Sequence, residues 1–165
     1  MAENGIFIRR LSEEEKPSAL ALIWEVFLKF EAPEYSSEGT EFFRSILDDK
    51  EYISEREFIG AFDGEKLVGV ISMGRSPHIN FFFVREEYHR RGIGRRLFET
   101  AVKSRPEKCI TVNASPYAVP VYRRLGFMPT DKMQETKGIK FSPMEYKKPL
   151  LTEVRQNDMI NCKIV

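Results

Sequence analysis

Apolar side chains recur every three or four residues in two stretches near the start of the chain. This spacing predicts two helices, each with one apolar face, over residues 13–31 and 37–48. Ser12 is followed three residues later by Glu15, a capping-box pattern that places the start of the first helix near Glu13. A short strand is expected before them at Ile6-Phe7-Ile8, where β-branched and aromatic residues follow one another.

The middle of the chain changes to the pattern of strands. Residues 57–62 and 66–73 are separated by Asp63-Gly64, which is a strong signal for a hairpin. In the next strand, over 79–84, the run Phe81-Phe82-Phe83-Val84 does not alternate, so both faces are expected to be covered. The later elements expected are a helix over 93–102, a buried strand over 109–112, a short helix over 120–125 and a last strand over 139–146.

Length and charge narrow the class of protein. With 165 residues the chain has room for one domain, expected over residues 1–148. The apolar tail over 149–165 is expected to pack on the domain or on a partner, which is compatible with a homodimer. Charged residues make up 31% and hydrophobic residues 42%, as in soluble globular proteins. The net charge of +1 offers no field for nucleic acid or a membrane, so neither is expected as a partner.

The two cysteines, Cys109 and Cys162, are far apart and match no zinc or redox spacing. They are expected to be reduced thiols of a cytoplasmic protein, and no metal is implied. The first ten residues lack the apolar core of a signal peptide, and no apolar run approaches the ~20 residues that a membrane helix needs.

The candidate chemistry begins where the strand over 79–84 leads into a glycine turn, Gly92-Ile93-Gly94, that opens the next helix. Such a turn leaves backbone N–H groups unpaired at the positive end of a helix, which is an anion site. Arg90, Arg91, Arg95 and Arg96 add charge, so a phosphate or pyrophosphate is the expected ligand. The turn lacks the Gly-Lys-Ser/Thr of a P-loop and the third glycine of a dinucleotide-binding fold. A plain helix entry with solvated arginines is the alternative.

A second motif follows in a strand end, a loop and a short helix: Asn113, Ala118, Tyr122, Gly126 and Phe127. Together with the glycine turn it resembles the Gcn5-related N-acetyltransferase (GNAT) family. That family has an Arg/Gln-x-x-Gly-x-Gly/Ala loop and a downstream Asn…Ala…Tyr-x-x-x-Gly-Phe signature, in the element order expected here. One position departs from the family, because His89 stands where the loop usually has arginine or glutamine. Histidine can still donate a hydrogen bond, and Arg90 or Arg91 can supply the charge.

The resemblance implies the GNAT fold, an α/β (α+β) fold whose mixed, mostly antiparallel twisted sheet of six to seven strands is flanked by about four helices. It implies an N-acetyltransferase that moves the acetyl group of acetyl-CoA to a primary amine of a small molecule or a protein by direct attack. Tyr122 matches the family's proton donor to the sulfur. The coenzyme A contacts that it implies are Phe83, Val84, His89, Arg90, Arg91, Gly92, Ile93, Gly94, Arg95 and Asn113. For Asn113, a strand-end turn is an equal alternative.

The base and the acceptor site are less defined. Many relatives carry a glutamate on the strand before the loop, where this chain has His78 and Asn80. The two side chains face one side if no bulge intervenes. His78, with an unperturbed pKa of about 6.5, is expected to act as base or base relay, with a polar strand cap or a water relay as alternatives. Trp24, Phe30 and Glu31 would form an acidic, aromatic acceptor wall, or else a solvated helix end.

Two other functions fit parts of the sequence. A non-catalytic acyl-CoA-binding module for regulation or sensing would use the same loop without turnover. A nucleic-acid patch over His89 and the loop arginines is disfavoured, because the rest of the chain is near neutral and no aromatic stacking motif accompanies them. The amine acceptor itself is left open.

Overall fold

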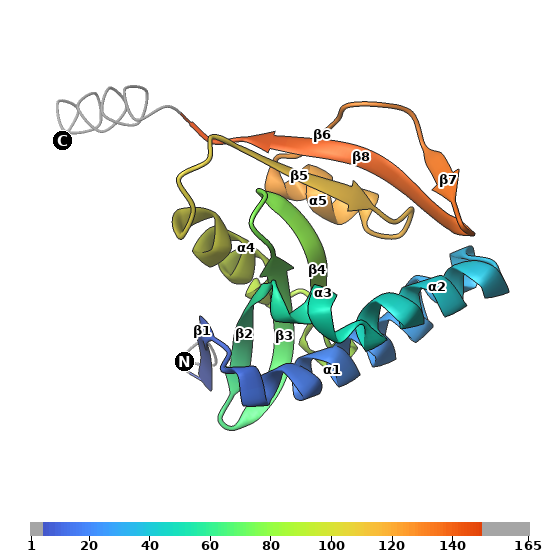
Figure 1. The fold of residues 1–165 in the computed structure, drawn as a ribbon. Helices are drawn as coiled ribbons and strands as arrows, with labels where there is room; N and C mark the ends of the chain where they lie inside the picture. The colour runs from blue at the N-terminus through green and yellow to red at the C-terminus, as the bar shows by residue number, and fades with distance from the viewer. Residues whose placement is uncertain (1–4, 150–165) are drawn as a thin grey trace, which may run out of the picture.

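A computed structural model describes residues 5–149 as five α-helices on one open sheet of eight strands (Figure 1). The strand order is β1-β2-β3-β4-β5-β8-β6, with β7 pairing β8, and every pair is antiparallel except β4 with β5. This mixed, mostly antiparallel sheet confirms the expected fold class. Residues 150–165, which hold nearly all of the predicted tail, lie outside the described part. No helix within residues 5–149 has both the length and the apolarity to cross a membrane.

The first strand and the two following helices are confirmed as β1 (Ile6–Arg10), α1 (Lys16–Phe30) and α2 (Ser37–Asp48). The capping box is present, since the Glu15 carboxylate accepts from the Ser12 N–H at 2.9 Å. A 3-10 turn at Glu13–Glu15 precedes α1. A short helix, α3 (Lys50–Ser54), begins where only a helix end was predicted, because Asp49 caps it by accepting from the Tyr52 N–H at 3.0 Å.

The strand predictions are confirmed, with small extensions, and two short strands are new. The hairpin turns at Gly64, which has the left-handed φ of +60° that glycine favours. The elements that follow α3 are β2 (Glu57–Asp63), β3 (Lys66–Met73), β4 (His78–Val84), α4 (Ile93–Lys103), β5 (Cys109–Ala114), α5 (Val119–Leu125), β6 (Met128–Pro129), β7 (Gln134–Thr136) and β8 (Ile139–Lys147). The short strands β6 and β7 both pair with β8.

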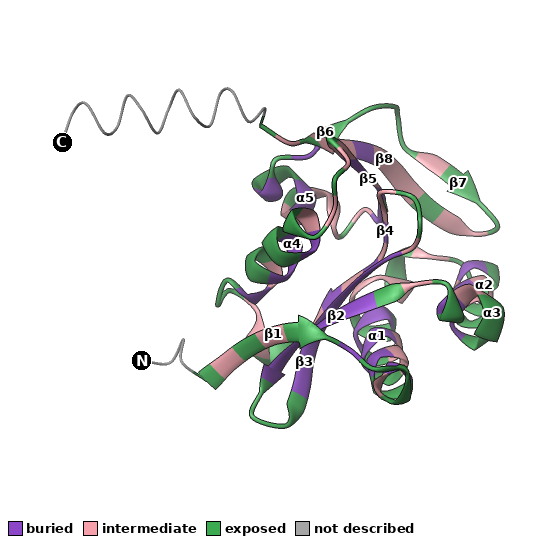
Figure 2. Cartoon of the chain, turned by 60° about the vertical axis from the view of Figure 1, so that its left-hand side comes forward, coloured by how far each residue is buried: buried purple, intermediate pink, exposed green. Residues whose placement is uncertain are grey.

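The core consists of two apolar clusters on opposite faces of the sheet. One joins the sheet to α1, α2 and α3, and the other joins it to α4 and α5. Figure 2 shows the buried residues gathered on β2, β3 and α1. Helices therefore cover β4 on both faces of the sheet.

The sheet opens between β4 and β5. These strands pair only at His78 with Thr111 and at Ile79 with Val112, whereas β4 stays paired with β3 as far as Val84. Figure 1 shows the β5–β8 part of the sheet at an angle to the β1–β4 part. This splay has a closed end near His78 and an open end near Val84.

A bulge in β4 corrects the predicted strand geometry. Ser72 lies opposite Phe81 and Met73 opposite Ile79, so Asn80 is an extra residue without a partner on β3. Ile79 consequently packs in the cluster on the α4 side, and Phe81 packs in the cluster on the α1 side. His78 and Asn80 therefore do not follow the regular alternation that the sequence suggested.

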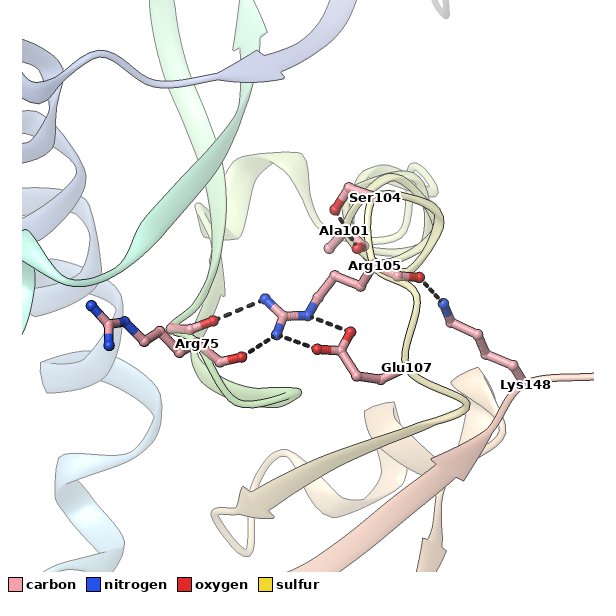
Figure 3. Close-up of polar contacts among 7 residues, drawn as sticks. Arg75, Ala101, Ser104, Arg105, Glu107 and Lys148 are labelled. Carbon is pink, nitrogen blue, oxygen red and sulfur yellow. Dashed lines mark hydrogen bonds and ion pairs between the residues drawn. The ribbon is translucent and has the colours of Figure 1, made fainter.

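The side chain of Arg105 fastens the closed end of the splay (Figure 3). Its guanidinium donates to the carbonyl oxygens of Gly74 at 2.9 Å and Arg75 at 2.7 Å, in the turn before β4. The same group pairs with Glu107, at 2.8 and 3.1 Å, just before β5. The Lys148 ammonium donates to the Arg105 carbonyl oxygen and so ties the end of β8 to the same region. The starts of β4 and β5 are thereby held together.

Candidate active site

A cleft of about 510 Å³ lies at the open end of the splay. Four segments form its walls: the end of α1, the end of β4, the glycine turn with the start of α4, and α5 with the loop before it. The sequence-predicted site residues that line it are Phe30, Glu31, Phe83, Val84, His89, Arg90, Gly92, Ile93, Gly94 and Tyr122. Those that do not line it are Trp24, His78, Asn80, Arg91, Arg95 and Asn113.

The glycine turn forms one end of the cleft. Gly92 caps α4 with a left-handed φ of +76°, a conformation that side chains disfavour. The first helical hydrogen bond runs from the Arg96 N–H to the Gly92 carbonyl oxygen at 3.1 Å. The backbone N–H groups of residues 93–95 precede that bond and are available to a ligand at the positive end of the helix.

The four arginines of the turn have different roles. Arg96 donates to the carbonyl oxygen of Ile6 at 3.1 Å and so ties α4 to β1. Arg95 donates to the carbonyl oxygen of Arg124 at 2.9 Å, and the Arg91 guanidinium lies over a tyrosine ring at 5.0 Å. Arg90 lines the cleft, and Arg124 from α5 joins it. The cationic end thus comes from two segments, of which the sequence identified one.

His89 is held by the backbone of β4. Its Nε2 atom is 2.7 Å from the Val84 carbonyl oxygen, and its ring lies 5.4 Å from that of Phe30. The residue that departs from the family pattern therefore links the glycine turn to the end of β4 and to α1.

Tyr122 is buried in the wall of the cleft, with 6% of its surface exposed. Its ring packs against Phe82 at 5.9 Å and against Phe127 at 5.2 Å. Burial, and to a smaller extent the charge of Glu31, raise the pKa of the Tyr122 hydroxyl above its ordinary value. A tyrosine hydroxyl is protonated at neutral pH even without this shift, so Tyr122 holds a proton in the wall of the cleft.

Glu31 is the half-buried carboxyl at the α1 side of the cleft. Burial is the main cause that raises its pKa to about 7, and the nearby charge of Glu34 adds to the rise. The Ser115 hydroxyl partly offsets both. A carboxyl in this state exchanges protons near neutral pH, which its place in the sequence did not indicate.

His78 lies at the closed end of the splay. Its Nδ1 atom is 2.8 Å from the hydroxyl oxygen of Thr111 on β5. Burial, and then the charge of Arg56, lower the pKa of His78. The neighbouring Asn80 has a buried side-chain oxygen with no hydrogen-bond partner within residues 5–149.

The other predicted residues outside the cleft are Asn113 and Trp24. Asn113 is exposed on β5. Trp24 stacks on Phe27 at 5.7 Å and lies under the Arg44 guanidinium at 4.9 Å. Of the predicted acceptor wall, only Phe30 and Glu31 reach the cleft.

Several residues of the cleft were not identified from the sequence. Ala118 belongs to the second motif but was not predicted to line the site. It lies four residues before Tyr122 and three before Val121, so helical spacing places it on one face with each of them. Tyr117 lies in a loop, where no periodicity identifies it. It stacks on Phe30 with 5.0 Å between ring centres and is 40% exposed.

Comparisons with known proteins identify the family and the fold. The model of the acetyltransferase (GNAT) domain matches residues 31–148. A GCN5-related N-acetyltransferase from Rhodopseudomonas palustris has 22% identity and a TM-score of 0.73, covering 86% of this chain and 94% of its own. The PaiA N-acetyltransferase from Thermoplasma acidophilum, in complex with coenzyme A, has 25% identity and a TM-score of 0.65, covering 86% and 98%. YjaB from Escherichia coli has 22% identity and a TM-score of 0.68, covering 87% and 99%. No curated protein matches the sequence significantly.

Proposed function

Because this chain belongs to the GNAT acetyltransferase family, we propose that it transfers the acetyl group of acetyl-CoA to a primary amine of a small molecule or a protein. The observation that carries the proposal is the cleft itself. It brings the free N–H groups at the start of α4, the end of β4 and the protonated Tyr122 hydroxyl into one space. The relative from Thermoplasma acidophilum, which is in complex with coenzyme A, supports the same donor here.

Coenzyme A would lie along the open end of the splay. Its pyrophosphate would accept from the N–H groups of residues 93–95 and from Arg90, with Arg124 as a further cation. The pantetheine arm would run beside Phe83 and Val84, where β4 has no β5 partner. We propose Arg91, Arg95 and Asn113 as contacts at the rim, because each lies beside the cleft segments without lining it.

The chemistry follows from these positions. A neutral amine attacks the thioester carbonyl, and backbone N–H groups around Phe83 and Val84 stabilise the oxyanion. The departing sulfur takes a proton from Tyr122. The phenol holds its proton at neutral pH, and its position in the wall of the cleft would let it protonate the thiolate that develops beside it. Burial raises the pKa of this hydroxyl and makes it a weaker acid than a free tyrosine, so the close approach of the thiolate has to supply the driving force.

The proposal that His78 acts as base or relay has less support than the proposal for Tyr122. His78 lies at the closed end, and its Nδ1 atom interacts with Thr111. It would have to act through water. Among the acceptor residues, Phe30 and Glu31 have the stronger support because both line the cleft, while Trp24 and Asn80 would act from behind it. A cytoplasmic location and a homodimer stay predictions.

Acetyl-CoA binding measured by calorimetry, followed by thiol release with a panel of primary amines, tests the function. We expect saturable binding and amine-dependent thiol release with an acetylated amine as product. Absence of binding at high micromolar acetyl-CoA would overturn the whole proposal. Binding without transfer to any amine would favour the acyl-CoA-binding sensing module instead.

A further inference from the structure

The position of Glu31 is set by the end of α1. Its N–H donates to the Phe27 carbonyl oxygen at 2.9 Å and terminates the helix. This brings Glu31 to the wall of the cleft that Tyr122 also lines. Among residues 5–149, Glu31 is the one carboxyl that lines the cleft.

Two glutamates of neighbouring segments are paired with a cation, whereas Glu31 and Glu34 have none within residues 5–149. Glu25 pairs with Arg85, and Glu86 pairs with Lys29. Glu31 makes no ion pair with any residue in the described range 5–149. A half-buried carboxylate without a cation is costly even where a hydroxyl such as that of Ser115 interacts with it, and a ligand that brings a positive charge would relieve that cost.

The groups that face Glu31 come from three segments and supply hydroxyls or negative charge. The charges of Glu34 and Glu31 repel each other, and the Glu31 charge raises the pKa values of the surrounding tyrosines. These groups are Glu34 and Tyr35 after α1, Ser115 and Tyr117 in the loop before α5, and Tyr122 in α5. Arg90 and Arg124, which line the same cleft, act in the opposite direction on the pKa of Tyr117 and belong to the proposed phosphate end.

We propose that Glu31 is the catalytic base of the acetyl transfer: its carboxylate binds the ammonium group of the acceptor and takes its proton. This inference rests on the proposed function and assigns the base to α1 rather than to β4. It explains why the one unpaired carboxylate of the cleft lies beside the proton donor.

The acidity of Glu31 suits this role. Its pKa of about 7 lets the carboxylate accept a proton and return it to water near neutral pH. Burial raises the pKa of a carboxyl and lowers that of an ammonium group, so the two groups approach each other in acidity inside the cleft. Proton transfer is therefore easier there than in bulk water.

The surroundings of Glu31 also define the acceptor. The stacked rings of Phe30 and Tyr117 offer an apolar face beside the carboxylate, with Tyr117 accessible at the mouth. Glu31 and Glu34 would repel a second carboxylate next to the amine. The acceptor is therefore a primary alkylammonium with an apolar chain and no carboxylate on the carbon that bears the nitrogen.

The protons and electrons balance. The ammonium gives one proton to Glu31, and the freed nitrogen pair forms the N–C bond to the thioester carbonyl carbon. The C–S bond then breaks, and its electron pair goes to sulfur, which takes a proton from Tyr122. The second proton lost from the nitrogen neutralises the Tyr122 phenolate, and the proton on Glu31 passes to water. The products are the amide, the free thiol and one proton.

The pH dependence of kcat/KM tests the assignment, with pentylamine as acceptor. For the unchanged protein, kcat/KM should rise as the pH increases through about 7, because the carboxylate form is the active one. Glu31→Gln should lower kcat/KM by at least about 100-fold and remove this rise. Glu34→Gln should move the rise to lower pH, because the Glu34 charge raises the pKa of Glu31.

Two further variants sharpen the result. Glu41→Gln changes an exposed carboxylate of α2 away from the cleft and should leave the profile unchanged. His78→Ala should keep the rise near pH 7. If His78→Ala removes the rise and Glu31→Gln keeps it, the base is His78 and the inference is overturned. Acetyl-CoA affinity equal to that of the unchanged protein would show that the Glu31→Gln variant is folded. If that variant does not fold, Glu31→Asp takes its place in the test.

A binding measurement separates this inference from the proposed function. Calorimetry of pentylamine with the coenzyme A complex should show affinity at least about tenfold weaker for Glu31→Gln. Norleucine, which adds a carboxylate to the same carbon skeleton, should bind the unchanged protein more weakly than pentylamine. Equal pentylamine affinity of the two proteins would overturn the role of Glu31, whether or not acetyl transfer occurs. Coenzyme A binding without any transfer would overturn the proposed function instead.

Discussion

The two ends of the β4–β5 pair both contain charged and polar groups, but these groups have partners within the protein at the closed end and lack them at the open end. At the closed end, the Arg105 guanidinium is saturated by Gly74, Arg75 and Glu107. At the open end, the N–H groups at the start of α4 and the Glu31 carboxylate have no partner of this kind among the described residues. At the closed end, polar groups bind one another and stabilise the fold. At the open end, polar groups of the cleft are left unpaired and are available to a ligand.

The pKa values of His78, at the closed end, and Glu31, at the open end, show the same contrast. Burial lowers the pKa of His78 and raises that of Glu31, since in each case the charged form is disfavoured. Only Glu31 lines the cleft. A shifted pKa therefore identifies a functional residue only together with access to the ligand.

The largest expected effect is at the open end. Tyr122→Phe removes the proton donor and should lower kcat by roughly 100-fold or more, within the range of general acid catalysis, while acetyl-CoA affinity is retained. Tyr146→Phe is the matched control, because this tyrosine packs in the same cluster but does not line the cleft. A Tyr122→Phe protein with unchanged kcat would show that the sulfur obtains its proton elsewhere.

A smaller effect is expected at the closed end, and on a different property. Arg105→Met leaves the Gly74 and Arg75 carbonyl oxygens and Glu107 without their donor. We expect the free energy of unfolding to fall by about 2 kcal/mol and Tm by about 4–8 °C. Thermal unfolding measures this, and Arg91→Met, a change at an exposed arginine, is the control. Loss of the pH profile rather than of stability would mean that the two ends are coupled.

The smallest expected effect links the carboxylate of the open end to stability. The folded-state pKa of Glu31 is about 7, above the ordinary 4.5 of an unfolded chain, so this group destabilises the fold as pH rises from about 4.5 to 7. The rise in pKa from 4.5 to about 7 corresponds to about 3.4 kcal/mol, which solvent screening of this partly exposed carboxyl reduces. Glu31→Gln should therefore be more stable than the unchanged protein by about 1 kcal/mol at pH 8 and equally stable at pH 4. Urea unfolding at both pH values measures the difference. A variant that is less stable at pH 8 would show that Glu31 has a compensating partner.

Most elements of the fold were predictable because their signals are local. The Ser12–Glu15 capping box and the Ser36 cap act within three residues, and the hairpin turn is two residues long. The helix α3 was missed because Asp49 ends one helix and caps the next. The strands β6 and β7 are too short to show a pattern and exist through their pairing with β8.

The candidate site divides in the same way. Gly92, Gly94 and Tyr122 belong to two sequence motifs, and all three line the cleft. Tyr117 and Arg124 became visible only when the fold brought α5 against the glycine turn. The bulge at Asn80 has no sequence signal, because it depends on how β4 pairs with β3.

By itself, the sequence determined the order of the elements, the glycine turn at the start of α4 and the tyrosine that matches the acetyltransferase signature. Each depends on residues close together in the chain. Only the tertiary structure decided where β4 and β5 separate, and which carboxylate is buried beside the tyrosine without a cation. Burial and pairing are set by side chains from distant segments. The local sequence around Glu31 therefore carries no record of the pKa of about 7 that the cleft imposes on it.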